Sequence, residues 1–195
     1  MVLSAFDQFL WAIIGLLLTI SGVFIEVAIP IPLLTWPIDL SEISTETLGV
    51  TLQLGAVLFV ACMGGRNAAA LSQIAYLALG LSGFQVFAQG GGLSYFREPT
   101  FGYLLGFLLG AWVCGDLAFR LARKIESLMV SALAGLGIIH GCGVVYFSLL
   151  ALVRQLPGGW WSTFLNYSLL PLPGQLIILC AVVFCSLLLR KILLY

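Results

Sequence analysis

The sequence predicts an all-α integral membrane protein, a bundle of six transmembrane helices in one domain. Its 195 residues are 62% apolar and 8% charged, and its mean hydropathy is +1.15. So few charged residues cannot cover the surface of a water-soluble domain of this length. The apolar residues also fall in stretches close to the about 20 residues that a helix needs to cross the hydrocarbon core of a bilayer. These two observations predict a membrane bundle.

The six expected helices cover residues 8–29, 47–64, 67–88, 99–119, 127–153 and 169–189. The first stretch has no basic region before it and no small-residue cleavage site after it, so we expect a retained span and not a signal peptide. No stretch remains for a soluble domain, and residues 1–195 are expected to form one unit.

Basic residues near the span ends predict the orientation. With an even number of spans, one side of the membrane carries Arg66, Arg120, Arg123, Lys124, Arg190 and Lys191. We expect this side to be cytoplasmic and both termini to lie there. The opposite side carries Arg97, Arg154 and several acidic residues, so the outer face is mildly acidic.

The first two outer segments differ in their chemistry. The proline-rich segment after the first span contains Trp36 and is expected to lie at headgroup level in the outer interface. Gly90, Gly91 and Gly92 follow the third span, where consecutive glycines permit positive φ and close backbone approach. Their spacing does not match a phosphate-binding loop, and we expect an outer loop over a cavity between the third and fourth helices.

The helix expected at 99–119 is the centre of the predicted bundle. Pro99 occupies a helix start, and Gly102, Gly106 and Gly110 form a stripe that lets a neighbouring helix approach closely. Thr100 and Tyr103 lie on nearly the same face at its outer end. They are the first candidates for a binding site.

The helix expected at 127–153 carries Gly137 and Gly141 at the four-residue spacing of helix contacts, and His140 between them. An intramembrane histidine is either a proton relay or ligand contact, or a side chain hydrogen-bonded for structure. No acidic neighbour in sequence accompanies His140, which favours the structural role.

Polar side chains cluster at the outer end of the predicted bundle. They are Gln85, Gln89, Thr100, Tyr103, Asn166, Tyr167 and Gln175. Amides, hydroxyls and aromatic rings together suit a small, largely uncharged ligand with an apolar body. The alternative is ordinary polarity of helix ends at an interface.

Several function classes lack support. The five cysteines all lie inside apolar stretches and form no Cys-x-x-Cys pair, so we expect small buried hydrophobes and no metal or redox site. No paired carboxylates or Ser-His-Asp order indicates an enzyme, and an intramembrane enzyme would rest on His140 alone. No cofactor is expected, and no basic run indicates nucleic acid. No nucleotide-binding motif is present, so the chain cannot hydrolyse ATP alone.

Three runs in order along the chain resemble the BioY family, the biotin-specific S components of energy-coupling factor (ECF) vitamin transporters. The runs are Leu52-Gln53, then 76–92 (YLALGLSGFQVFAQGGG), then 99–107 (PTFGYLLGF). The family's Gly-Pro-Thr-Gly-Gly-Tyr-Leu appears at 98–104 with Glu98 and Phe101 in place of two glycines. Its Leu-Pro-Gly-Asp appears at 172–175 with Gln175 in place of the acid. The resemblance covers about residues 50–178.

The resemblance implies a membrane receptor that binds biotin near the outer face, in the cell membrane of a prokaryote. The implied substrate-binding residues are Gln85, Gln89, Arg97, Thr100, Gly102, Tyr103 and Gln175. Two departures concern charge. Gln175 stands where the family has an acidic residue, and Ile178, three positions later, stands where the family has a basic one. Gln175 can still hold a ureido ring, as an amide offers a donor and an acceptor. Arg97 or Arg154 would then meet the ligand carboxylate.

The implied partners are the bilayer, a transmembrane coupling subunit and two ATPases. The first helix lacks the Ala-x-x-x-Ala pattern through which the family contacts the coupling subunit. The other possibility is that the protein works without a dedicated module, through self-association or a shared module. Two further readings stay open at this point: an S component for another small vitamin, and a membrane scaffold in which the glycines serve only helix packing.

Overall fold

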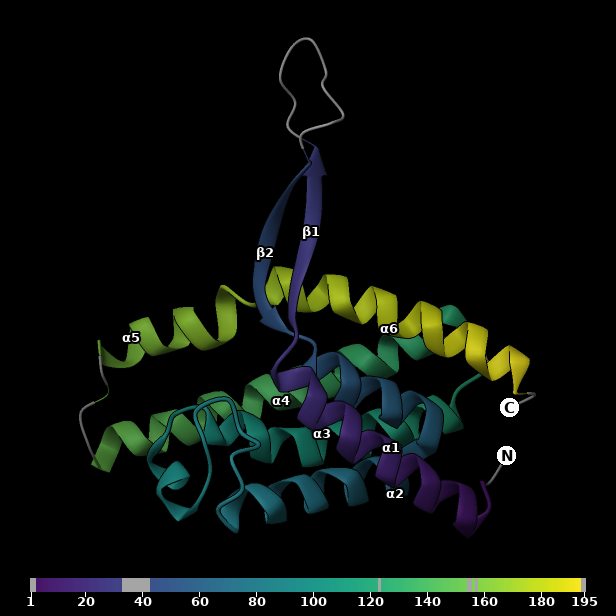
Figure 1. The fold of residues 1–195 in the computed structure, drawn as a ribbon, viewed down its shortest axis with the longest axis horizontal. Coiled ribbons are helices and arrows are strands. Elements are labelled where there is room, and N and C mark those ends of the chain that lie inside the picture. The colour runs from purple at the N-terminus through teal and green to yellow at the C-terminus, as the bar shows by residue number, and fades with distance from the viewer. Residues whose placement is uncertain (1–2, 33–42, 123, 154–155, 157, 194–195) are drawn as a thin grey trace.

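The computed structural model describes residues 3–32, 43–122, 124–153, 156 and 158–193 as a bundle of helices with one β-hairpin (Figure 1). The helices are α1 (Ala5–Val23), α2 (Gln53–Leu81), α3 (Phe101–Arg120), α4 (Ile125–Val153), α5 (Gly159–Phe164) and α6 (Leu172–Ile192). A 3₁₀ turn, η1 (Leu93–Arg97), and a π-helical turn, η2 (Leu165–Leu169), connect them. Strands β1 (Glu26–Pro32) and β2 (Ile43–Thr51) pair antiparallel.

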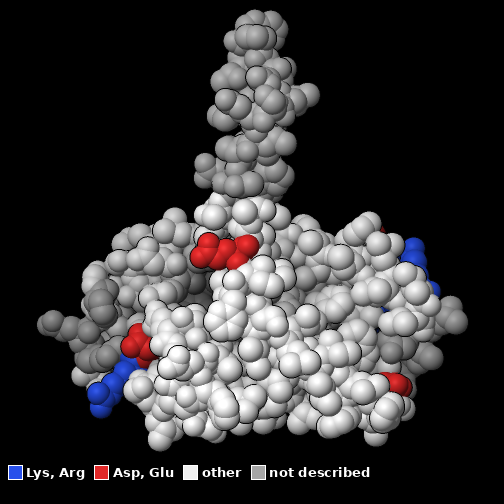
Figure 2. Space-filling view, viewed as in Figure 1, with Lys and Arg blue, Asp and Glu red and all other residues white. Residues whose placement is uncertain are grey.

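Within the described residues, five helical segments are long and apolar enough to cross a membrane: Ala5–Val23, Gln53–Leu81, Phe101–Arg120, Ile125–Val153 and Gly159–Ile192. This confirms the mostly helical membrane architecture. Figure 2 shows a largely uncharged face, with Lys and Arg toward its two ends and acidic residues in the middle and near both ends. A surface of this kind matches contact with lipid.

The hairpin corrects two predicted helix limits. The first helix ends at Val23 and not at residue 29, and α2 begins at Gln53 and not at residue 47. Pro30 and Pro32 cannot continue a helix, and β-branched residues alternate through Ile43–Thr51, which favours strands. The two strands project from the bundle (Figure 1). Trp36, predicted at headgroup level, lies outside the described residues.

Helix α2 is two helices that fold back on each other at Gly65. Gly65 has φ 74° and ψ −179°, a conformation that interrupts the helix and favours glycine. The amide of Gln53 at one end of α2 donates to the hydroxyl of Tyr76 near the other end at 2.8 Å, which a straight helix would not allow. The second and third predicted helices, 47–64 and 67–88, are therefore an antiparallel pair joined at residue 65. The second of them ends at Leu81, earlier than residue 88.

The predicted glycine stripe on α3 packs against α4. A Cβ on Gly102 would lie 2.8 Å from Cγ of Tyr146, one on Gly106 would lie 2.8 Å from Cα of Ile139, and one on Gly110 would lie 2.7 Å from the carbonyl oxygen of Gly135. Backbones this close gain van der Waals contact that larger residues would prevent. The stripe is confirmed as a helix contact.

The predicted contact through Gly137 and Gly141 is wrong. A Cβ at either position would meet nothing within 4 Å, so both glycines face open space among the described residues. The glycines of α4 that pack are Gly135, against Leu58 and Cys114, and Gly143, against Tyr103. The four-residue spacing alone does not say which face of a helix meets a neighbour.

The segment before α6 also differs from the prediction, which placed a loop at 154–168. Gly159–Phe164 is a short helix that continues into η2, and α6 begins at Leu172 with Pro173 in its first turn, where a missing N–H costs nothing. Trp160 stacks on Phe164 with the two rings 5.5 Å apart and nearly parallel. These turns cover the end of the bundle where the candidate site lies.

The opposite end of the bundle is held by a buried arginine. Arg190 on α6 is 7% exposed. Its guanidinium donates to the carbonyl oxygens of Cys62 and Ala118 and lies 4.5 Å above the ring of Phe119. It therefore joins α6 to α2 and α3. The first residues of α1 and the last of α6 lie at the same end of the bundle (Figure 1).

Candidate functional site

A cavity of about 380 Å³, here called the amide pocket, lies at the end of the bundle where β2 enters α2. Its walls come from β2, the start of α2, the 88–100 segment, α3, α4, the turns before α6 and the start of α6. It is lined by Gly49, Val50, Thr51, Gln53, Leu54, Ala88, Gln89, Tyr95, Thr100, Tyr103, Leu104, Phe107, Ile139, Asn166, Tyr167, Pro171 and Gln175. None of these described lining residues is ionised at neutral pH, so the pocket suits an uncharged group.

The pocket exists because the first half of α2 is short. This half runs only from Gln53 to the interruption at Gly65, about 18 Å at 1.5 Å per residue, whereas α3 is about 30 Å long. Gln53 therefore stands part of the way along the bundle, and the space beyond it is open. Its amide donates to the Tyr76 hydroxyl, which in turn donates to the carbonyl oxygen of Val86 at 3.0 Å. This chain of hydrogen bonds joins the α2 pair to the loop after it and fixes one wall.

The loop after α2 is held by its glycines. Phe87 and Gly90 form a β-bridge, and the N–H of Gly92 donates to the carbonyl oxygen of Gly80 at 2.7 Å. Gly90 and Gly92 have positive φ, and a Cβ on Gly91 would collide with the backbone of Phe84. The predicted loop over a cavity is thus a tight turn, and Gln89 within it reaches the pocket wall.

A second wall is aromatic. Tyr95 is buried, its ring lies 4.7 Å from that of Phe87, and its hydroxyl accepts from Thr100 at 3.3 Å. Burial raises the pKa of the Tyr95 phenol above its ordinary value, while the hydrogen bond from Thr100 opposes that shift. The group therefore stays a neutral hydroxyl at physiological pH, able to donate or accept.

The third wall brings α3, α4 and α6 together. The Tyr103 hydroxyl pairs with that of Ser168 at 2.6 Å, and the Tyr103 ring meets the ring of His140 edge-on at 5.7 Å. His140 Nε2 lies 2.7 Å from Oε1 of Gln175. The expected structural hydrogen bond of His140 is present, and its partner is a lining residue of the pocket.

Four of the seven predicted binding residues line the amide pocket: Gln89, Thr100, Tyr103 and Gln175. The other three lie outside its lining. Gln85 and Arg97 are exposed on the loop and on η1, and Gly102 packs against Tyr146. Arg154 lies outside the described residues. Asn166 and Tyr167, predicted in the same outer cluster, do line the pocket.

The sequence reasoning did not assign Tyr95, Thr51 or Gln53 to the site. For Gln53 the available signal was its place inside the helix expected at 47–64, because an amide within a span prefers the bundle interior. Tyr95 gave no such signal, because it lies between two predicted helices. Thr51 was expected inside the helix at 47–64, whereas it is the last residue of β2. Ile178 belongs to none of the three walls; it is buried against Gly55, facing an apolar groove between α1, α2 and α6.

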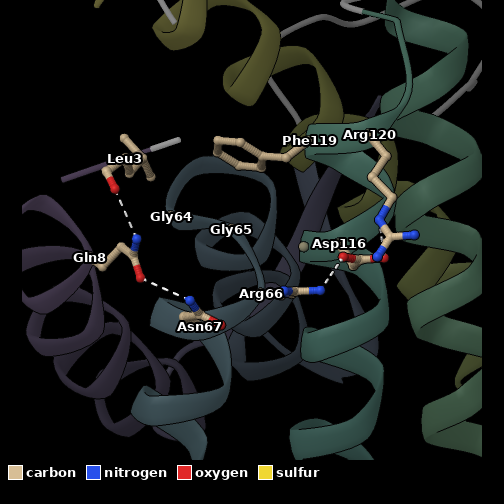
Figure 3. A pocket seen from close by; sticks show the side chains of 10 residues that line it. Leu3, Gln8, Gly64, Gly65, Arg66, Asn67, Asp116, Phe119 and Arg120 are labelled. Carbon is tan, nitrogen blue, oxygen red and sulfur yellow. Dashed lines mark hydrogen bonds and ion pairs between the residues drawn. The ribbon is translucent and has the colours of Figure 1, made fainter. Parts of the chain in front are cut away.

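A second cavity, about 300 Å³ in volume, lies at the opposite end of the bundle (Figure 3). There Asp116 accepts from Arg66 at 2.9 Å and from Arg120 at 2.8 Å, and Asn67 donates to Gln8 at 3.1 Å. These contacts join α1, the α2 turn and α3. The polar groups there hold the helices to one another, so the amide pocket is the better candidate for ligand binding.

The comparison with known proteins identifies the family. The sequence pattern of the BioY family matches residues 3–194, which is nearly the whole chain. The chain belongs to the BioY family. A family member described as a probable biotin transporter BioY, from Lysinibacillus sphaericus, is 36% identical over 151 residues, covering 76% of this chain and 68% of the relative. The biotin transporter BioY of Thermotoga maritima is 43% identical over 98 residues, covering 48% and 56%.

Two further matches cover almost the full length. An uncharacterised 21.2 kDa protein from the psbX-ycf33 intergenic region of Cyanophora paradoxa is 28% identical over 94% of this chain and 95% of its own. The crystal structure of the S-component for biotin from an ECF-type ABC transporter superposes with a TM-score of 0.70 at 20% identity, covering 95% of this chain and 92% of that one. This match shows the same fold. Together with the apolar helices, family membership makes this a multi-pass membrane protein.

Proposed function

We propose that this BioY-family protein is the biotin-binding membrane component of a vitamin uptake transporter and that the amide pocket holds the ligand. Family membership carries the proposal. The pocket supports it, since a cavity of about 380 Å³ lined by neutral amides, hydroxyls and aromatic rings suits a ureido ring with an apolar body. The candidate contacts are Gln89, Thr100, Tyr103 and Gln175. No catalytic step is part of this function.

The ligand carboxylate needs a partner outside the neutral pocket. Arg97 ends η1, two residues beyond the lining residue Tyr95, and we assign it this role at the pocket mouth. A guanidinium there would receive the carboxylate without a buried charge. Arg97→Ala should weaken biotin more than a neutral biotin amide. Equal weakening of both ligands would remove Arg97 from this role.

The topology that fits this function has six crossings, with α2 supplying two of them as its folded halves. The end of the bundle with Arg66, Arg120 and Arg190 is placed in the cytoplasm by the positive-inside rule, and the amide pocket then opens outward. The membrane is the plasma membrane of a prokaryote.

Energy would come from a coupling subunit with two ATPases, or the protein would act through self-association. A coupling subunit would have to contact α1 on a face other than that of Gly15, because Gly15 packs against Val60 and Ser72 inside the bundle. Co-purification with a coupling subunit, set against the mass of the protein alone in detergent, distinguishes the two arrangements.

The deciding test is equilibrium binding of labelled biotin to the purified protein in detergent, with unlabelled biotin and riboflavin as competitors. Saturable binding displaced by biotin alone is the expected result. Absence of binding by protein with a cooperative thermal transition would overturn the proposal. The second candidate function is an S component for another small vitamin. It is favoured because Gln175 and Ile178 replace the family's two charged residues, and specific binding of another vitamin in the same assay would establish it.

A further inference from the structure

We propose that His140 orients the amide of Gln175 so that the pocket presents the NH₂ donor of that amide to the ligand. The inference rests on the proposed function. It makes His140 a positioning residue for specificity, although it is not part of the pocket lining.

The first step concerns the protonation of His140. Its Nδ1 is buried and has no hydrogen-bond partner among the described residues. Protonation would leave an N–H there without an acceptor, and no charged residue among those that line the adjacent pocket compensates a cation. The neutral tautomer with hydrogen on Nε2 is the one that this environment accommodates.

The second step concerns the amide. In the neutral tautomer Nε2–H donates to Oε1 of Gln175, and the 2.7 Å separation is that of a well-formed hydrogen bond. An amide rotated by half a turn would place its NH₂ group against the Nε2–H, donor against donor. His140 therefore fixes which end of the amide is occupied, and the NH₂ group of Gln175 is the end left for a ligand.

The position of the imidazole is itself held. The ring of Tyr103 contacts it edge-on at 5.7 Å, and the Tyr103 hydroxyl is fixed to Ser168 at 2.6 Å. His140 and Tyr103 thus belong to one packed unit across α3, α4 and the turn before α6. A rotation of the imidazole would disturb the third wall of the pocket, which Tyr103 helps to form.

The consequence is a rule for the ligand. A carboxylate at position 175 would accept hydrogen bonds from ligand N–H groups, whereas the fixed amide donates to a ligand acceptor such as a ureido carbonyl oxygen. A cyclic guanidinium, which carries only donors, would place its N–H groups against the NH₂ of Gln175. A site built for one partner rejects an analogue that lacks it, because a buried polar group is left unpaired.

The test compares biotin with 2-iminobiotin, whose guanidinium, like that of arginine, carries only donors at neutral pH. We expect wild type to prefer biotin. In His140→Ala the amide is free to rotate, so the ratio of the two affinities should fall about tenfold, the scale of one hydrogen bond. In a Gln175→Leu background, His140→Ala should leave the ratio unchanged.

The matched control is Tyr146→Phe, on the same helix, which removes a hydroxyl that donates to the carbonyl of Phe96; neither residue lines the pocket. It should keep the wild-type ratio. If His140→Ala weakens both ligands by the same factor, or lowers the ratio equally in the Gln175→Leu background, His140 does not orient Gln175. Failure of wild type to bind either ligand would instead refute the proposed function.

Discussion

The contact between Gly143 and Tyr103 offers the sharpest test of how helix packing shapes the amide pocket. A Cβ on Gly143 would lie 2.5 Å from both Cε1 and Cε2 of Tyr103, so the glycine backbone lies flat on the ring. The ring cannot easily retreat, because its hydroxyl is bonded to Ser168 and its edge packs on His140. Gly143→Ala must therefore displace a wall of the pocket.

The magnitude follows from overpacking, which costs about 1–3 kcal/mol for an added methyl in a filled interior. If that cost falls on the ligand-bound conformation, the affinity for biotin should drop about fivefold to a hundredfold. An alanine also stabilises a helix by about 0.5–1 kcal/mol over glycine in water, which partly masks the effect on stability. A control with the same helix contribution is needed.

Gly141→Ala is that control, since it lies on the same helix and its Cβ would meet nothing within 4 Å. Affinity is measured by equilibrium binding and folding by thermal unfolding in detergent. If Gly143→Ala folds poorly, adding Tyr103→Leu should restore stability by making room but should not restore binding. Equal affinities of Gly141→Ala and Gly143→Ala would refute the reasoning.

Three other predictions concern residues around the site and at the far end. Arg190→Met should lower the free energy of unfolding by about 1–3 kcal/mol, because buried carbonyls of α2 and α3 lose their donor. Lys191→Met, at an exposed position, should not lower it, and thermal unfolding of both variants checks this. Gly80→Ala places a methyl 2.5 Å from Cε2 of the buried Phe87 and should weaken biotin binding through the loop that carries Gln89, measured as an increased Kd. Burial raises the pKa of Tyr95 in the folded protein. The stability gained from burying the neutral phenol is therefore fully present below the pKa of about 10 in the unfolded chain, and it is lost as pH rises through the higher pKa of the folded protein. Thermal unfolding above about pH 10 should therefore show a loss that Tyr95→Phe reduces, and identical pH profiles of the two proteins would contradict it.

The helical parts of the fold were predictable where the sequence pattern is local. The limits of α3 and α4 fall within two residues of the predicted 99–119 and 127–153, because a long apolar run in lipid has to satisfy its backbone within one helix. The limits failed where a helix meets a strand. Residues 24–29 and 47–52 are apolar enough for a span, yet prolines and β-branched residues nearby place the strands β1 and β2 there.

The candidate site divides in the same way. Thr100 and Tyr103 were found from one helix turn, and Gln175 from a short motif, since each signal lies within a few residues. Tyr95 was missed because its place in the pocket depends on the turn after α2. Arg97 does not line the pocket, and its proposed role is at the pocket mouth.

What the sequence determined by itself is the class of protein and its family: composition excludes a soluble domain, and the ordered motifs from residue 50 to residue 178 identify a BioY protein. Which face of a helix packs was decided only by the tertiary structure. Gly141 and Gly143 stand two residues apart on α4, yet one faces open space and the other supports Tyr103. The pairing of His140 with Gln175 was decided there too, because it joins residues 35 positions apart. Composition and short motifs are local properties, whereas contacts depend on how the helices are rotated and crossed.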